Sequence, residues 1–400
     1  MRYKTAKLGN HLYIKGRIGW KGLKKSEYLK KSSYRIINGE SLTTSGIDWN
    51  KAGYISEDRY NESPEIMLQI NDILISKDGT IGKIGYISEL DKPTTVASGI
   101  FVIRNRQPDF IDTRFVYHFL CSPYFKNFVV ARTEGSVIPH LYQKDFVDLD
   151  FPLFSLEEQK KISSILDSIE RKIQLNKEIN KNLEEQVLTL YHNRFINIVN
   201  DKRRICRADE YFDISIGKTP PRKELQWFST NSQDVTWVSI SDMGTCGLYI
   251  NSSSEQLTKA AVNWYNIKIV PDNTVLLSFK LTVGRIAITD GEMSTNEAIA
   301  HFKTDKKEIN EYLYCFLKCF NYRTMGSTSS IATAVNSKII KSMPFVVPTD
   351  DELTEFHSIA APMFANIKIN QNECKNLAVL RDTLLPKLMS GKLDVSALDI

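Results

Sequence analysis

The sequence predicts an α+β protein made of two similar globules and two long helices that pair as an antiparallel coiled coil. The first observation is a stretch of forty residues, Leu156 to Phe195, that is rich in helix formers and contains neither Gly nor Pro. The second is an internal repeat whose period is close to half of the 400 residues. The third is the turn-rich, β-prone sequence that precedes a helical pattern in each half of the chain.

The long helical stretch carries a single apolar stripe. Its members are Ile162, Leu166, Ile169, Ile173, Asn176, Asn180, Leu183, Val187, Leu190 and Arg194. They follow one another in steps of four and three residues, the 3.5-residue period of a helix that packs against a partner helix. At about 1.5 Å per residue such a helix is roughly 60 Å long, so we expect a partner of similar length.

The internal repeat supplies that partner. The segment IQLNKEINKNL from Ile173 returns as IKINQNECKNL from Ile367, and residues 71–87 match residues 273–289. The offsets of the two matches, 194 and 202 residues, differ by only a few positions, as insertions in loops would produce. The chain is therefore predicted to be a tandem duplication in which each long helix pairs with its own duplicate.

Each half is expected to contain a β-rich region, a strand–turn–strand unit, a short helix, an apolar segment with proline and the long helix. The predicted boundaries are 1–154 for the first globule, 155–200 for the first long helix, 201–348 for the second globule and 349–400 for the second long helix and tail. The second helix is expected from about Asp351 to Met389, with Pro362 and Pro386 shortening or bending it.

The expected seam of the second helix contains Ile367, Asn370, Leu377 and Leu384. At the register of the repeat, Asn176 corresponds to Asn370, and both lie near the middle of their helices. An Asn in an apolar seam costs stability but fixes the alignment of two helices. We therefore expect the two asparagines to meet near the pseudo-dyad.

Composition narrows the class of protein. No apolar run approaches the roughly 20 residues that cross a membrane, and the N-terminal residues contain no signal-peptide core. Six cysteines occur without the spacing of a zinc site. These features predict a cytoplasmic protein with reduced thiols, no membrane partner and no metal site.

Positive charge is concentrated at the N-terminus. Between Met1 and Arg35 there are eleven Lys or Arg residues and a single acid, Glu27. Such a basic stretch with interspersed Tyr and Trp suits a polyanion, most often nucleic acid, although a solvated basic face explains the charge equally well. The candidate DNA contacts here are Arg17, Trp20 and Lys21, with a place in the core as the alternative for Trp20.

The repeated strand–turn–strand unit contains further candidate DNA contacts on its loop. They are Lys77, Thr80 and Lys83 in the first copy and Lys280, Thr282 and Arg285 in the second. Hydroxyls, backbone amides and cations on one loop suit phosphates and base edges, and the alternative is a plain hairpin with a solvated tip.

The second half adds two more candidate segments. Lys218, Thr219 and Arg222 belong to a proline-rich basic loop that could contact DNA or form an ordinary turn. Ser241 and Asp242 follow Trp237, and Asp242 could accept a hydrogen bond from cytosine or cap a turn. No phosphate-binding glycine loop and no persuasive catalytic motif is present in the sequence, so no catalytic residue and no bound cofactor is predicted.

The chain resembles a known family over essentially its full length. The segments that carry the resemblance are PLFSLEEQ from Pro152, GKTPP from Gly217, WVSISDM from Trp237, VLLSFKLTVGR from Val275 and LLPKLMSGK from Leu384. They are similar to segments of the DNA-specificity subunit of Type I restriction-modification systems.

The resemblance implies two target-recognition domains that together recognise a bipartite, asymmetric DNA sequence, with the paired helices setting the gap. Residues 1–150 would recognise one half-site and residues of about 205–348 the other. The resemblance also implies that catalysis lies in other chains. Two modification subunits would dock along the outward faces of the helices, near Lys160, Lys161, Arg171, Lys177 and Lys181, and supply S-adenosylmethionine. Restriction subunits would supply ATP-driven translocation and Mg²⁺-dependent cleavage.

The two halves depart from the family pattern in different places. The first lacks the GKTPP and WVSISD segments, so its base contacts cannot be transferred from the second. The second has Asp351-Glu-Leu where the first has Glu-Glu-Gln, which weakens the expected match of its helix entry. Two other functions are kept as alternatives: a stand-alone DNA methyltransferase or nuclease, and a coiled-coil scaffold with two protein-binding globules.

Overall fold

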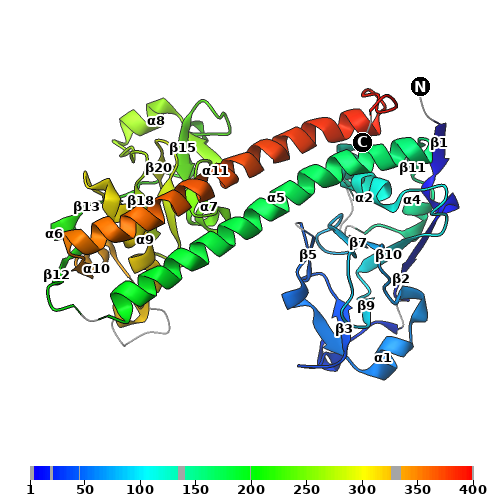
Figure 1. The fold of residues 1–400 in the computed structure, drawn as a ribbon. Coiled ribbons are helices and arrows are strands. Elements are labelled where there is room, and N and C mark those ends of the chain that lie inside the picture. The colour runs from blue at the N-terminus through cyan, green and yellow to red at the C-terminus, as the bar shows by residue number, and fades with distance from the viewer. Residues whose placement is uncertain are drawn as a thin grey trace. The chain divides into compact units, whose positions relative to one another are not determined.

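The structure, a computed structural model, describes residues 4–18, 21–44, 46–133, 140–198, 200–325 and 335–398. Two compact units are present: unit 1 contains Met1–Lys172 and Leu377–Ile400, and unit 2 contains Ile173–Asn376. Each unit therefore holds one globule and a part of each long helix (Figure 1). The boundaries predicted from the sequence separate the globules from the helices. The two compact units instead each include part of both long helices.

Unit 1 contains a four-stranded antiparallel sheet in the order β2-β10-β7-β8, a three-stranded sheet in the order β6-β3-β9 and two strand pairs, β1-β11 and β4-β5. The strands are β1 (Lys4–Lys7), β2 (Leu12–Gly16), β3 (Tyr34–Ile37), β4 (Leu42–Thr43), β5 (Gly46–Ile47), β6 (Gly53–Ile55), β7 (Ile73–Ser76), β8 (Ile84–Tyr86), β9 (Thr94–Val96), β10 (Ile100–Asn105) and β11 (Asp150–Leu153). The short helices are α1 (Glu57–Asn61), α2 (Thr113–Cys121), α3 (Pro123–Thr133) and α4 (Gln143–Val147).

Unit 2 contains a five-stranded sheet in the order β13-β21-β18-β19-β16, a four-stranded sheet in the order β14-β17-β15-β20 and the pair β12-β22. The strands are β12 (Arg204–Arg207), β13 (Asp213–Ile216), β14 (Phe228–Ser229), β15 (Val235–Val238), β16 (Tyr249–Ile250), β17 (Glu255–Leu257), β18 (Val275–Ser278), β19 (Ile286–Thr289), β20 (Ser294–Thr295), β21 (Ile299–Lys303) and β22 (Pro344–Val347). The short helices are α6 (Ala208–Tyr211), α7 (Ile240–Thr245), α8 (Lys259–Trp264), α9 (Asn310–Cys319) and α10 (Ser337–Lys341).

The topology confirms the duplication. The strand order β2-β10-β7-β8 of unit 1 corresponds to β13-β21-β18-β19 of unit 2, and β6-β3-β9 corresponds to β17-β15-β20. In both three-strand sets the middle strand has one antiparallel and one parallel neighbour. The closing pairs β1-β11 and β12-β22 also correspond, so the two globules share one fold.

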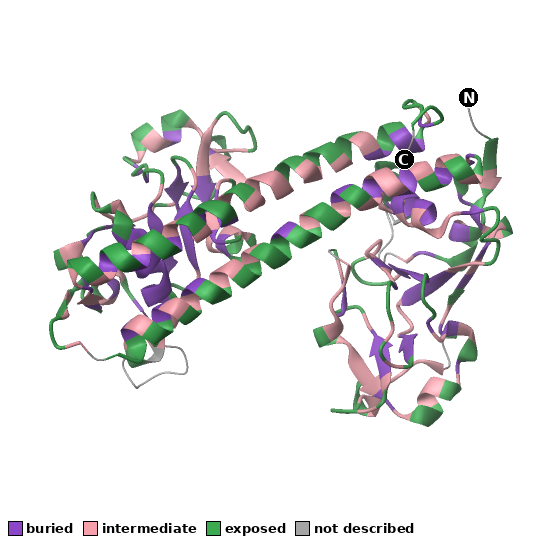
Figure 2. Cartoon of the chain, viewed as in Figure 1, coloured by how far each residue is buried: buried purple, intermediate pink, exposed green. Residues whose placement is uncertain are grey.

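Strands β7 and β18, the first strands of the two repeated units, are buried on both faces, which explains their unbroken apolar sequence. In β7, Ile73 packs in the main core of unit 1, whereas the next residue, Leu74, packs in a second core between the two sheets. In β18, Val275 and Leu276 divide in the same way between two cores of unit 2. Figure 2 shows buried residues in the central strands of each globule and only at intervals along the long helices.

The predicted long helices are confirmed. The first, α5 (Leu156–Tyr191), continues as a π-helical turn, His192–Ile196, and the second is α11 (Asp350–Met389). Within unit 1, Ile162 of α5 shares a core with Leu388 of α11, and within unit 2, Val187 shares a core with Phe356. The start of one helix thus packs beside the end of the other in each unit, as an antiparallel pair requires.

The sequence predicts that Pro362 and Pro386 shorten or bend α11, and the predicted shortening is wrong. Pro362 and Pro386 both lie inside the helix, which continues from Asp350 to Met389. An internal proline removes one backbone hydrogen bond and costs about 3 kcal/mol or more. Burial of the flanking side chains Ala360 and Phe364, at 0 % and 1 % exposure, offsets that cost next to Pro362.

The seam follows the predicted stripe in part. Its buried members are Ile162, Leu166, Ile169, Asn176, Val187 and Ile367, and its half-buried members are Ile173, Leu183, Leu190, Asn370, Leu377 and Leu384. The buried stripe of α11 also includes Phe356, Ala360 and Phe364, which the repeat alone did not assign to the seam.

The expected contact between Asn176 and Asn370 is wrong. Asn370 donates from Nδ2 to Oδ1 of Asn180 (2.8 Å), and Asn176 donates from Nδ2 to Glu373 (2.6 Å). The helices are shifted by about one turn from the register in which equivalent asparagines would face each other. Repeat alignment identifies equivalent positions, but it does not fix which residues face each other across the seam.

The two long helices begin with the same cap. Ser155 and Glu158 form a capping box before α5, with the Ser155 amide 3.1 Å from the Glu158 carboxylate. Thr349 and Glu352 form the equivalent box before α11, with an amide–carboxylate distance of 3.0 Å. No helix among the described residues combines the length and the hydropathy that a bilayer crossing requires.

Candidate nucleic-acid interface

The repeated hairpin is held by one serine in each copy. Ser76 donates from Oγ to the carbonyl of Thr80 (2.7 Å) and accepts from the amide of Lys83 (2.9 Å). Ser278 donates to the carbonyl of Thr282 (2.6 Å) and accepts from the amide of Arg285 (3.0 Å). We call this pair of hydrogen bonds the serine lock. It satisfies the backbone at the base of each loop and leaves the side chains at the tip without a structural role in the sheet.

A glycine completes the lock in each copy. The amide of Gly82 donates to the carbonyl of Ser76, and that of Gly284 donates to the carbonyl of Ser278, each at 3.0 Å. Both glycines have positive φ angles, +81° and +91°, which side chains with a Cβ adopt only at a cost. The repeated glycine in the sequence is therefore explained by the turn and not by a phosphate cradle.

In unit 2 the structure gathers predicted contact residues around Glu297. The Thr219 hydroxyl donates to the Glu297 carboxylate. Burial raises the pKa of Glu297, but the Thr219 hydroxyl and the nearby charges of Lys280 and Arg222 together lower it below its ordinary value. The loop that carries Thr219 therefore lies beside the tip of the second hairpin.

The basic proline-rich loop is held closely against the sheet. A Cβ at Gly217 would collide with Thr295, so only glycine allows this approach. Lys218 is exposed and donates from Nζ to the carbonyl of Tyr265 (2.7 Å). Arg222 pairs with Glu255 (2.8 Å) and lies 4.7 Å from the centre of the Trp237 ring. This side of unit 2 therefore presents several cations and hydroxyls on rigid supports.

Asp242 completes the capping box of α7, in which Ser239 is the N-cap residue. Its carboxylate accepts from the amide and the hydroxyl of Ser239, at 2.8 and 2.7 Å, and from the amide of Ser254 at 3.0 Å. Burial raises the pKa of Asp242, but these hydrogen bonds lower it below its ordinary value. Of the two interpretations left open by the sequence, the structure supports the cap of α7, while Ser241 is exposed on the same helix.

The Arg285 side chain also contacts α7. Its Nη1 donates to the carbonyl of Ile240 (2.6 Å), and its guanidinium lies against Gly244, where a Cβ would leave it too little room. The guanidinium is thus used to hold α7 on the hairpin. We therefore leave Arg285 and Asp242 out of the DNA contacts proposed below.

The substitution Asp242→Ala separates a capping role from a base contact. We expect it to lower the free energy of unfolding by about 1 kcal/mol, the usual cost of losing a capping side chain. Thermal or urea unfolding measures this loss. The DNA sequence recognised by the protein should be unchanged, and a changed sequence without a loss of stability would contradict the assignment.

In the first hairpin, two of the three predicted DNA-contacting side chains bind other groups of the protein. Thr80 is exposed, but Lys83 donates to the carbonyl of Gly39 (2.9 Å). Lys77 pairs with Asp78 at 3.0 Å and has only 14 % of its side chain exposed. Asp78 also accepts from His140. The tip of the first hairpin therefore carries less net positive charge than the tip of the second hairpin.

The basic N-terminal stretch does not form one surface. Arg17 is 4 % exposed, and its guanidinium donates to the carbonyl of Val96 (3.1 Å) and to the Ser63 hydroxyl (3.3 Å). This burial gives Arg17 a structural role, and the proposed interface does not include it. Lys21 is half-buried and donates to the carbonyl of Glu62 (2.6 Å). Trp20 lies outside the described residues.

Leu281, at the tip of the second hairpin, was missed by the sequence analysis. The repeat alignment places it opposite Gly79, and that mismatch was the available signal. Glu297 was also missed, because an isolated acid in a loop carries no motif. Leu281 lies at the tip of the second hairpin, and Glu297 lies between β20 and β21.

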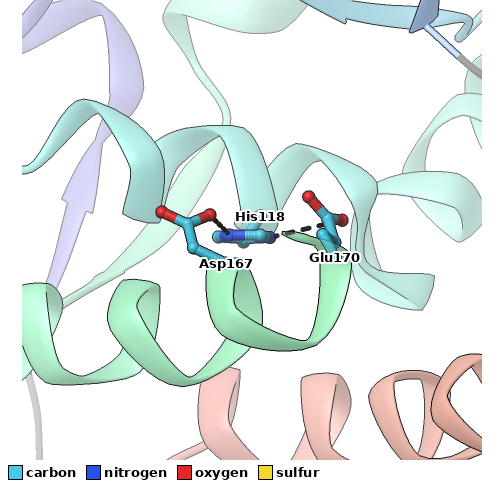
Figure 3. Close-up of side chains that lie close together, drawn as sticks. All are labelled: His118, Asp167 and Glu170. Carbon is cyan, nitrogen blue, oxygen red and sulfur yellow. Dashed lines mark hydrogen bonds and ion pairs between the residues drawn. The ribbon is translucent and has the colours of Figure 1, made fainter. Parts of the chain in front are cut away.

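A separate cluster of titratable residues lies where α2 packs on α5 (Figure 3). His118 is 2.7 Å from the carboxylate of Asp167 and 4.0 Å from that of Glu170, a grouping that could in principle hold a metal ion. Arg114 already bridges both carboxylates, with Nε 2.9 Å from Asp167 and Nη2 3.4 Å from Glu170. Burial raises the pKa of Asp167, but the hydrogen bonds from His118 and Arg114 lower it to about 2. The cluster is therefore an ion-pair network that fixes α2 to α5.

Comparison with known proteins decides the family. The sequence profile of the Type I restriction modification DNA specificity domain matches the chain twice, at residues 17–185 and at residues 204–378. The chain belongs to this family. The two matches cover both globules and most of both long helices, and they confirm the resemblance drawn from the sequence segments.

Individual members of the specificity family align with most of the chain. The specificity subunit of the Type I restriction enzyme MjaIX from Methanocaldococcus jannaschii is 24 % identical over 381 residues, covering 86 % of this chain and 84 % of that protein. The HindI specificity subunit from Haemophilus influenzae is 20 % identical over 383 residues, covering 76 % and 82 %. The crystal structure of a Type I restriction-modification S subunit from M. genitalium has a TM-score of 0.56 at 16 % identity, covering 97 % and 96 %, and shows the same fold.

The structure also explains the Glu-Glu-Gln segment on which the resemblance to specificity subunits partly rested. Gln159 is fully buried, and its side chain bonds to the amide of Asp112 (2.9 Å) and the carbonyl of Phe154 (2.9 Å). The equivalent position in the second copy is Leu353, which is 4 % exposed. The second copy thus has a buried apolar side chain where the first has a buried, hydrogen-bonded glutamine. It keeps the capping box at Glu352.

Proposed function

We propose that this chain recognises a bipartite, asymmetric DNA sequence and directs the modification and restriction subunits of a Type I system to it. The observation that carries the proposal is the double match to the DNA specificity domain, with one copy on each globule. Two domains of one fold but different loop residues would each recognise their own half-site. An asymmetric, divided target follows from that arrangement.

The second hairpin and the loops beside it are the DNA contacts that we propose for unit 2. They carry the exposed residues Lys218, Arg222, Lys280 and Thr282, with Thr219 half-buried beside them. Cations on such a surface neutralise phosphates, and hydroxyls position the backbone or contact base edges. For unit 1 we propose the tip of the first hairpin around Thr80, with Lys77 and Lys83 at its sides.

We place catalysis in other chains of the complex. S-adenosylmethionine would be bound by two modification subunits, and ATP and Mg²⁺ by restriction subunits. Double-stranded DNA and these subunits are the proposed partners. For docking of the modification subunits we propose the outward faces of the long helices, where Lys160, Arg171, Lys177 and Lys181 are exposed. Lys161 is excluded from this face, because it is 15 % exposed and donates to the carbonyl of Ser396 (3.0 Å).

Co-expression with a modification subunit, followed by genome-wide mapping of methylated adenines, tests the proposal. The expected result is one divided motif that is methylated only when both chains are present. Methyl transfer by the purified chain alone would instead establish a stand-alone enzyme. Failure of the two-chain complex to bind any duplex, at low as well as high salt, would favour a protein scaffold.

A further inference from the structure

The tip of the second hairpin presents a leucine to solvent in a backbone conformation that leucine rarely adopts. Leu281 is 100 % exposed, and its φ angle is +59°. At the equivalent position of the first hairpin, Gly79 has a φ angle of +68°. Both loops therefore place this residue in the left-handed region, which glycine adopts without strain.

Folding gives no reason for a leucine at this position. The serine lock holds the base of the loop, and a fully exposed side chain adds nothing to either core of unit 2. A left-handed backbone at a residue with a Cβ carries a free-energy cost. Residues that keep such costs commonly contact a ligand, so the outlier points to function.

The surroundings of Leu281 indicate the chemistry of that ligand. Its chain neighbours Lys280 and Thr282 are exposed. The positive charges of Lys280 and Arg222 both lower the pKa of Glu297 at the side of the loop. A single apolar side chain among cations and hydroxyls does not match an apolar protein surface, which would need a larger patch. It does match a DNA groove, where phosphates border base edges and the thymine C5-methyl is the apolar group in the major groove.

We propose that Leu281 is a specificity-determining residue that contacts the C5-methyl group of one thymine in the half-site recognised by unit 2. This inference rests on the proposed function. The lock would hold the loop rigid, Lys280 would contact a neighbouring phosphate, and Leu281 would exclude water from the methyl group. The first copy, with Gly79 at the same place, would lack this contact.

Deoxyuridine scanning tests the inference. Each thymine of the mapped motif is replaced in turn by deoxyuridine, which removes only the methyl group, and binding to the complex of the full chain with modification subunits is measured. For the unsubstituted protein we expect one position, in the half-site of unit 2, to lower affinity by about fourfold, the factor that one buried methyl group supplies. In Leu281→Gly that position should have no effect, and affinity for the thymine duplex should already be lower by a similar factor.

The Leu281→Gly variant should fold at least as well as the parent, because glycine adopts the positive φ angle without strain. An unchanged or raised Tm together with weaker binding would support the proposal. The matched control is Ile205→Ala, which removes another exposed apolar side chain, 68 % exposed, from strand β12, whose ladder partner is β22 and not the hairpin. Its binding and its deoxyuridine profile should equal those of the parent.

Two results would overturn the inference while leaving the proposed function intact. One is specific binding by the parent complex with no deoxyuridine position that depends on Leu281. The other is a Leu281-dependent rise in 2-aminopurine fluorescence at one base step, which would show insertion between bases instead of a methyl contact. A parent complex that fails to distinguish the mapped motif from a scrambled duplex would reject the proposed function itself.

Discussion

Exchange of residues 1–154 for the corresponding segment of another specificity subunit is expected to change one half of the methylated motif and leave the other half unchanged. The junction follows from the structure. Strand β1 pairs with β11 along its whole length, from Lys4 opposite Leu153 to Lys7 opposite Asp150. A junction at residue 150 would pair a foreign β1 with the native β11, so both strands must come from the same parent.

Methylation mapping in cells that express each hybrid measures the outcome. The original motif should lose methylation, because each mismatched base pair in a half-site costs about 1–3 kcal/mol of binding free energy. The matched exchange of residues 201–348, which carries both β12 and β22, should change only the other half. Alteration of both halves by either exchange would show that the two globules do not act independently.

Replacement of Arg203 by alanine is expected to give the largest loss of stability among the single substitutions considered. The Arg203 side chain is 7 % exposed and lies between the end of α5 and the start of α11. Its guanidinium contacts the Glu352 carboxylate at 2.8 Å and the carbonyls of Phe195 and Ile198 at 2.9 Å each. Arg203→Ala leaves these acceptors unpaired, so we expect the free energy of unfolding to fall by about 2–3 kcal/mol.

The loss should depend on pH. Burial raises the pKa of Glu352, but hydrogen bonds from Arg203, Asn200 and the amide of Thr349 lower it to about 2. The unfolded chain therefore binds the proton more readily, and this stabilisation is complete above about pH 4.5 and is lost as the pH falls towards 2. The difference in unfolding free energy between the parent and Arg203→Ala should shrink over the same range.

Chemical unfolding of both proteins between pH 7 and pH 2.5 measures this dependence. The matched control is Lys306→Ala, which removes the ion pair with Asp350 at the same end of α11, where the two side chains are 51 % and 89 % exposed. An exposed pair adds little to stability, so the control should unfold like the parent. A difference for Arg203→Ala that is independent of pH would contradict the assigned role of Glu352.

Much of the fold could be predicted because the two halves of the chain can be compared with each other. Two copies of each strand and helix signal agree, and this agreement identified the hairpins at residues 71–87 and 273–289 and both long helices. The expected ends of α11 agree with the structure, but the sequence could not show whether Pro362 would interrupt the helix, because that depends on the tertiary packing of Ala360 and Phe364. The partner of Asn370 could not be predicted either, because the register depends on packing along the whole seam.

The candidate site was predicted less well, for a physical reason. Sequence shows which side chains can donate or accept but not where their hydrogen bonds go. Asp242 and Arg285 hold α7, and Arg17 is buried, although each has the chemistry of a DNA contact. The reverse error concerns Leu281, which has no hydrogen-bonding chemistry and becomes noticeable only through its exposure and its φ angle.

The serine lock also has a consequence for how these proteins diversify. In both hairpins the hydroxyl of Ser76 or Ser278 satisfies the loop backbone, so the tip between the lock residues can change without weakening the sheet. Substitutions at the tip therefore leave the hydrogen bonds at the base of the loop in place. Gly79 and Leu281, at one position of a single ancestral loop, are two outcomes of that freedom within the same chain. A lineage could acquire a new DNA target by substitutions at the tip while the core that supports it stays the same.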